Sequence, residues 1–169
     1  LKVARMGHPV LRAKARPLSP ADIRTPEIQK LIDDMIETMV TAIESGDDPM
    51  RNRMFFELRI IGPASVPALV ELMKDSRVKV REYAIHTVSY IDDERWIDPV
   101  LGVLKTDPEA STRAMACRAI ARTQDTPVLA EAGRKAIPIL MEKLPKEEEV
   151  VAMDAAAARA KASKATLYR

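Results

Sequence analysis

Two stretches that share one residue frame decide the fold of this chain: VPALVELMKDSRVKVREYA at 66–84 and DPVLGVLKTDPEASTRAMA at 98–116. They align without a gap at an offset of 32 residues, and the alignment superimposes a proline, an aspartate and an arginine in the spacing Pro-x7-Asp-x5-Arg. The same aspartate-to-arginine spacing occurs once before them, whereas a proline-led copy that begins at residue 137 has neither charged residue in place. An internal repeat of this length is typical of a solenoid. The aligned residues are Pro67 and Pro99, Asp75 and Asp107, and Arg81 and Arg113, with Asp47 and Arg53 as the earlier pair.

Each repeat has the pattern of two helices separated by a polar turn. In the second half of the first stretch, apolar residues recur from Val80 to Ile91 at the spacing of one helix face. The composition agrees, because helix formers dominate, aromatic residues make up 4% of the chain, and many of the 12 prolines stand near expected helix starts. A single helical hairpin cannot bury its apolar face alone, so we expect successive hairpins to stack.

We therefore predict an all-α fold, an α-solenoid of about four antiparallel helix pairs preceded by an extended N-terminal arm. The arm should end at a helix start, with Thr25 as the N-cap and Pro26 in the first turn. We divide the chain into an arm (1–24), a helical repeat domain (25–163) and a C-terminal tail (164–169). The first helices of the pairs are expected at about 25–46, 64–74, 94–106 and 132–145, and their partners at about 49–61, 77–91, 108–123 and 147–163.

The repeated frame resembles HEAT repeats, which stack antiparallel helix pairs into a curved rod. In that family the aspartate of the turn and the arginine of the second helix form a ladder of hydrogen bonds between neighbouring repeats. Such a ladder is chemically reasonable, because a carboxylate at a helix N-terminus accepts charge-assisted hydrogen bonds from a guanidinium. The resemblance implies that Asp47, Asp75 and Asp107 pair with Arg53, Arg81 and Arg113.

Residues 1–39 carry a second resemblance, to the N-terminus of bacterial peptide deformylase, a metalloenzyme that removes formyl groups from nascent proteins. The similar segments are 1–3, GHPVLR at 7–12, 15–17 and 25–39. The similarity then stops, and LIDDMIETMVTAIES at 31–45 is expected to serve as the first helix of the first repeat, because Asp47 follows it in frame. A natural fusion, a relic and an engineered junction would each produce this arrangement.

The deformylase resemblance implies a metal-dependent hydrolase, but the sequence lacks the metal ligands of that family. Deformylases bind their metal through a cysteine and the two histidines of a His-Glu-x-x-His helix, whose glutamate acts as acid and base. This chain has two histidines, His8 and His86, which are far apart, and one cysteine, Cys117, within a repeat helix. We therefore predict no enzymatic activity, no catalytic or metal-binding residue, and no cofactor.

We predict instead a noncatalytic scaffold that binds another protein or a peptide. If the second helices line the concave face, as is usual in HEAT arrays, one column of side chains runs across neighbouring units. These side chains are mixed and small, and so suit a protein or peptide better than a phosphate backbone. The residues expected on this face are Glu82, His86, Ser89, Arg118 and Arg122.

The charge distribution leaves a second kind of partner open, namely nucleic acid or the ribosome. Residues 1–24 carry six cationic side chains and one acidic one, whereas residues 25–48 carry seven acidic side chains and one lysine. Such an arm either binds RNA or folds back over its own acidic helix, and we favour the second because the charges nearly cancel. No apolar run approaches the roughly 20 residues that span a bilayer, so we expect no membrane partner and a bacterial cytoplasmic location. The oligomeric state stays open.

Three further residues could have either a chemical role or a role in packing. Trp96 stands among acidic residues near a helix start, where it either holds a cation or an extruded base or packs between repeats, and we favour packing. We expect Cys117 to be a small core residue and His86 to lie on the surface of a second helix.

Overall fold

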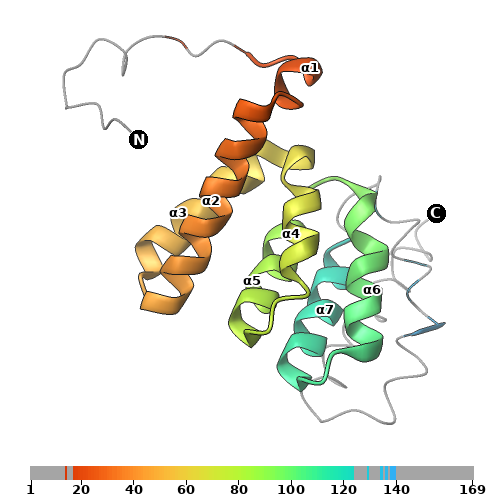
Figure 1. The fold of residues 1–169 in the computed structure, drawn as a ribbon. Coiled ribbons are helices and arrows are strands. Elements are labelled where there is room, and N and C mark those ends of the chain that lie inside the picture. Colours follow the sequence, from red (N-terminus) through yellow and green to blue (C-terminus); the bar gives the residue numbers. More distant parts are fainter. Residues whose placement is uncertain are drawn as a thin grey trace.

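The computed structural model describes residues 17–123 continuously, together with residues 14, 129, 134, 136, 138 and 139. Within this part of the chain the regular structure is entirely helical, which confirms the predicted all-α fold (Figure 1). A short helix precedes three helix pairs. The helices are α1 (Pro20–Ile23), α2 (Pro26–Ser45), α3 (Asp48–Ile61), α4 (Val66–Leu72), α5 (Val78–Val88), α6 (Ile97–Thr106) and α7 (Ala110–Arg122), with 3-10 turns at Gly62–Ala64 and Glu94–Trp96.

The first helix pair shows why the helix bounds could be predicted within a few residues. Helix α2 begins at Pro26 and ends at Ser45. Its C-cap, Gly46, has a left-handed φ of 71°, which costs a glycine little because it has no Cβ. Helix α3 then begins at once, because the Asp47 carboxylate accepts a hydrogen bond from the backbone N–H of Met50 at 3.0 Å. These start and stop signals are local, so the sequence alone reveals them.

The N-terminal arm differs from the prediction in the residues that are described. We expect an extended segment up to residue 24, but residues 20–23 form α1. The cause is a capping box, in which the Ser19 hydroxyl accepts from the Asp22 N–H at 3.1 Å and the Asp22 carboxylate accepts from the Ser19 N–H at 2.9 Å. Thr25 does occupy the N-cap position of α2, but its hydroxyl donates to the Asp22 carbonyl instead of capping the helix. Residues 1–13 lie outside the described part.

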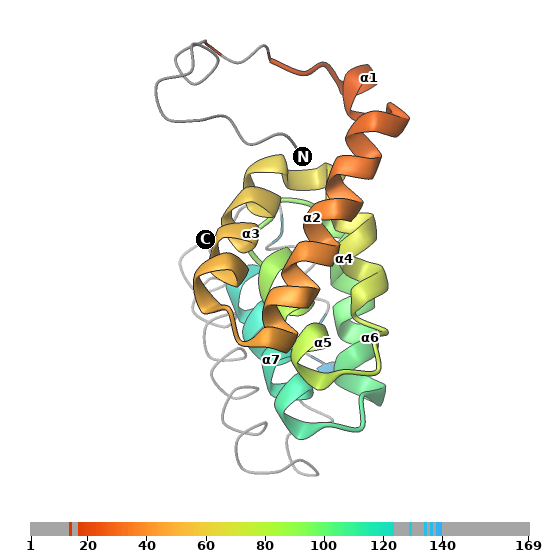
Figure 2. The same cartoon turned by 60° about the vertical axis from the view of Figure 1, so that its left-hand side comes forward.

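The three helix pairs stack side by side. Helices α2, α4 and α6 form one layer, and α3, α5 and α7 form the other (Figure 2). Within each pair the two helices pack against each other, and between pairs α5 packs extensively against α7, while α3 meets α5 and α2 meets α4. This arrangement is an α-solenoid, as predicted. Most of the expected fourth pair, at 132–145 and 147–163, and the tail at 164–169 lie outside the described residues.

The core runs without a break through all three pairs and includes two of the residues weighed above. The Trp96 side chain is fully buried, and its indole N–H donates to the Ile91 carbonyl at 3.0 Å, which satisfies its only polar group. Cys117 is also fully buried, within α7. Both predictions of a packing role are therefore confirmed.

Arg81 is the centre of the charged contacts between the second and third pairs. Its guanidinium donates to both carboxylate oxygens of Asp107, with Nε–Oδ2 at 2.8 Å and Nη2–Oδ1 at 3.0 Å. The remaining nitrogen, Nη1, donates to the carbonyls of Asp75 at 3.0 Å and Ser76 at 3.1 Å. Arg113 repeats this local contact one unit later, since its Nη1 donates to the Asp107 carbonyl at 2.8 Å. The Arg81 and Asp107 side chains are only 9% and 6% exposed, so this link between units is buried.

The contact between the first and second pairs departs from the expected ladder. Arg53 is exposed, and Asp47 uses its carboxylate to cap α3. The link runs instead through Arg77, which donates to the Asp75 carboxylate at 2.8 Å and 2.6 Å and also pairs with Glu44 at the end of α2. Hydrogen bonds from the Arg77 guanidinium lower the pKa of Asp75 from 3.8 to about 2. Arg77 stands only two residues after Asp75, so it reaches this carboxylate locally.

Replacement of a buried leucine should test the continuity of the core. Leu104 is fully buried, so Leu104→Ala should lower the free energy of unfolding by about 2–5 kcal/mol through lost apolar contacts and a residual cavity. Leu31 on α2 is 40% exposed, so Leu31→Ala is the matched control and should cost less than about 1 kcal/mol. Urea denaturation followed by circular dichroism measures both, and equal losses would contradict the assigned core.

Removal of one partner from the Arg81 pair should be costly in the same assay. Asp107→Asn keeps the side-chain shape but leaves a largely buried guanidinium without its carboxylate, so we expect a loss of roughly 3 kcal/mol. Asp34→Asn removes an exposed partner of Lys30 on α2 and should cost less than about 1 kcal/mol. A loss at Asp107 no larger than that at Asp34 would show that the buried pair does not hold the units together.

Candidate functional site

The layer of second helices carries a cluster of aromatic rings and arginines on α3, α5 and α7, which we call the aromatic–arginine cluster. On α3 the side chains follow each other at intervals of one turn, and on α5 they recur at helical spacing, so each set shares one helix face. The α7 contribution comes from the last residue of that helix. The members are Arg51, Phe55 and Arg59 of α3, Tyr83 and His86 of α5, Tyr90 just after α5, and Arg122 of α7.

Three rings form the centre of the cluster. Phe55 stacks on His86 with ring centroids 5.0 Å apart and an interplanar angle of 27°. Tyr90 meets both of them edge-on, at 5.2 Å from Phe55 and 5.1 Å from His86. Such edge-to-face and stacked contacts are favourable beyond the apolar area they bury. The rings therefore join α3 to α5 and hold one another in place.

Arginines cover the tyrosine rings from neighbouring helices. The guanidinium carbon of Arg122 lies 3.5 Å from the Tyr90 ring centroid, and that of Arg59 lies 5.5 Å from the same centroid. Arg51 lies 4.5 Å from the centroid of Tyr83 and also pairs with Asp48. Cations placed over aromatic faces are attracted by the ring quadrupole. The cluster is thus built from three successive helix pairs and carries positive charge at its edges.

The electrostatics of the cluster disfavour the protonated form of His86. Burial lowers the pKa of His86 below its usual range, and the positive charge of Arg122 lowers it further. Burial likewise raises the pKa of the Tyr83 hydroxyl. Beside these residues lies a hollow of about 300 Å³ lined by Glu82, Tyr83, His86 and Met115. Glu82 is the acidic group at this hollow.

Only some of the residues predicted to line the binding face are exposed on it. Arg118 is exposed, and Glu82 and Arg122 are partly exposed. Ser89 is a correction, since it is 8% exposed and its hydroxyl donates to the His86 carbonyl at 2.7 Å. His86 is a second correction: it lies half-buried among rings instead of on the open surface, because Phe55 on the neighbouring helix covers it.

Sequence reasoning missed most of the cluster, namely Arg51, Phe55 and Arg59 on α3, Tyr83 on α5 and Tyr90 just after α5. A signal was present on each helix. Arg51, Phe55 and Arg59 recur every four residues, a spacing that places them on one face of a helix. The two helices meet through tertiary packing, however, and no spacing along the chain shows which faces come together.

The described residues contain neither a cluster of metal ligands nor a helix that could span a membrane. No group of three or more histidine, cysteine, aspartate or glutamate side chains that could hold a metal ion occurs in the part of the chain that the structure describes. None of the helices described is both long enough and apolar enough to cross a lipid bilayer. His8 lies outside the described part.

Comparison with known protein families identifies both halves of the sequence pattern. The family described as polypeptide deformylase matches residues 1–46, and the family described as HEAT repeats matches residues 36–121, about half of the chain. No curated protein and no solved structure matches the chain. The HEAT match spans α3 to α6, the second half of α2 and nearly all of α7, so the family and the observed stacking agree. The chain therefore belongs to the HEAT-repeat family.

Proposed function

We propose that this protein is a noncatalytic scaffold that binds another protein or a peptide through the face formed by α3, α5 and α7. The observation that carries the proposal is the aromatic–arginine cluster, in which side chains from three successive helix pairs converge on one ring, Tyr90. Tyrosine and arginine are enriched among residues that dominate binding energies at protein interfaces. Of the predicted face residues, Glu82, His86, Arg118 and Arg122 remain part of the proposal, and the buried Ser89 does not.

The exposed apolar side chains of α3 also support a protein partner. Phe56 is 54% exposed and Ile60 is 79% exposed, and they lie one turn apart on this helix. Phe56 contacts Phe55 of the cluster, with ring centroids 5.1 Å apart. The apolar surface is therefore continuous with the cluster, as in interfaces where an apolar centre is bordered by polar groups.

The deformylase reading is the alternative, and the chemistry of the described residues argues against it. A catalytic metal site needs ligands that converge and leave one position open to water. Cys117 is fully buried within α7, and His86 is surrounded by Phe55, Tyr83, Tyr90 and a guanidinium. The deformylase match also ends at residue 46, before either of them.

Selection of peptides from a displayed random library should identify ligands and the face they use. We expect enriched peptides to slow amide hydrogen exchange in α3, α5 and α7 more than in α2, α4 and α6, because a ligand protects the backbone beneath it. Exchange read by mass spectrometry locates the protection. Protection confined to α2, α4 and α6 would place the binding face on the other layer, and a failure to enrich any peptide would refute the scaffold proposal.

A deformylation assay tests the alternative directly. The full chain, mixed with Fe²⁺, Ni²⁺ or Zn²⁺ and a formyl-methionyl peptide, should release no formate above the buffer background, because the family's ligand set is missing from the sequence. Formate can be quantified with a coupled formate dehydrogenase assay. Release that a chelator stops, and that His86→Ala or Cys117→Ala removes, would establish an enzyme and contradict our proposal.

A further inference from the structure

Two arginines on the proposed face differ from the arginines that link the helix pairs in how their charge is compensated. Arg77, Arg81 and Arg95 each pair with a carboxylate. Arg59 and Arg122 form no ion pair within the described residues, and both lie over the ring of Tyr90. The Nε atom of Arg122 is buried and has no hydrogen-bond partner in the same part of the structure.

The charge of Arg122 acts on a neighbouring side chain. Burial lowers the pKa of His86, and the positive charge of Arg122 lowers it further, in line with the place of this guanidinium over the adjacent Tyr90 ring. Two cations from α3 and α7 that approach one ring repel each other, and a carboxylate placed near both would relieve that repulsion. A guanidinium also binds a carboxylate with planar, charge-assisted hydrogen bonds that an ammonium cannot reproduce.

The apolar neighbours of Arg59 add a second requirement for the ligand. Phe56 lies three residues before Arg59 and four before Ile60, and both spacings make surface neighbours on a helix, so the three side chains form one strip on α3 that is centred on Phe56. Phe56 and Ile60 are two of the four large apolar side chains that are clearly exposed among the described residues. A ligand for this strip therefore needs apolar side chains beside its carboxylates.

We propose that the strip of Phe56, Arg59 and Ile60, together with Tyr90 and Arg122, is a docking surface for an acidic segment of another protein that also carries apolar side chains. One carboxylate lies between the guanidinium groups of Arg59 and Arg122, and an apolar side chain packs on Phe56 and Ile60. This inference rests on the proposed scaffold function and names the chemistry of its partner. Charge complementarity of this kind sets specificity and association rate at interfaces.

The arrangement of the rings favours an acidic peptide over single-stranded nucleic acid. Nucleic-acid grooves offer open aromatic faces on which bases stack. Here Arg122 lies directly over Tyr90, and His86 stacks on Phe55, so these ring faces are already covered.

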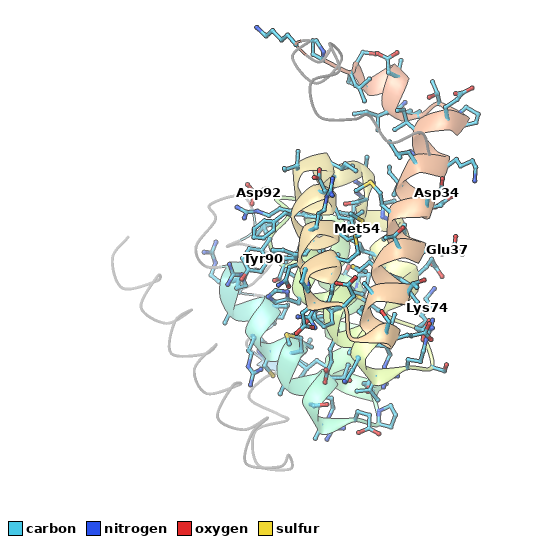
Figure 3. All side chains as sticks on the ribbon, turned by 90° about the vertical axis from the view of Figure 1, so that its left-hand side faces the viewer. Asp34, Glu37, Met54, Lys74, Tyr90 and Asp92 are labelled. Carbon is cyan, nitrogen blue, oxygen red and sulfur yellow. The ribbon has the colours of Figure 1, made fainter. Side chains whose placement is uncertain are left out.

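The test uses the full chain and a fluorescein-labelled peptide that repeats Leu-Glu-Glu, with fluorescence anisotropy as the readout. We expect R59Q and R122Q together to weaken binding by about tenfold or more, because both charged contacts are lost. K74Q is the matched control, because Lys74 lies on the side of the molecule away from Tyr90 (Figure 3) and pairs only with Glu71 in the described structure. It should leave the affinity for the peptide unchanged.

A second pair of substitutions tests the apolar part of the surface. F56A together with I60A should weaken binding of the Leu-Glu-Glu peptide more than binding of a Gly-Glu-Glu peptide.

Several outcomes would overturn the proposal. The proposal is wrong if the Leu-Glu-Glu peptide does not bind, or if a Leu-Lys-Lys peptide binds the protein equally well. It is also wrong if the R59Q/R122Q variant binds the Leu-Glu-Glu peptide as tightly as the parent protein does. Finally, it is wrong if a polyuridine oligonucleotide binds more tightly than the peptide and displaces it. If R122Q fails to fold, R59Q alone carries the test, since Arg59 is exposed on α3. Basic peptides enriched from the display library at this face would refute the acidic partner and leave the scaffold proposal intact, whereas no enriched peptide would refute both.

Discussion

The structure depends on the fact that no helix pair in this chain can cover its own apolar surface. Leu58 in the first pair, Val88 in the second and Leu104 in the third are all fully buried, although each pair alone would leave part of its surface in water. Stacking buries this surface, because each pair packs against the apolar face that its neighbour would otherwise expose. The continuous core and the two-layer arrangement both follow from this one requirement.

Apolar packing alone would allow neighbouring pairs to slide and rotate against each other, and directional contacts remove that freedom. Arg81 binds two carbonyls in its own unit and both oxygens of Asp107 in the next, so a small shift would leave a buried charge unsatisfied. The first pair is attached by more exposed contacts through Arg77 and Glu44. Solvent screens such contacts, so they restrain the orientation of the first pair less strongly.

The same stacking creates the candidate site. Phe55, His86 and Arg122 belong to three different helix pairs and meet only because α3, α5 and α7 lie next to each other in one layer. The deformylase-like segment ends within the same architecture, since α2 packs against α3 as the first helix of the first pair. A segment that is similar to part of an enzyme family can thus supply a helix to a repeat array when its apolar face has the spacing that the array needs.

The sequence by itself determined the helices, their pairing and the repeated frame. Proline and glycine at helix ends, the capping aspartate Asp47 and the apolar spacing from Val80 to Ile91 act within a few residues, so they are visible along the chain. Only the tertiary structure decided which helix faces meet: it placed Ser89 inside, enclosed His86 between rings, and replaced the expected Arg53 link by Arg77. The physical reason is that these outcomes depend on distances between residues some thirty positions apart, which are set by how whole helices pack and not by any local preference of the chain.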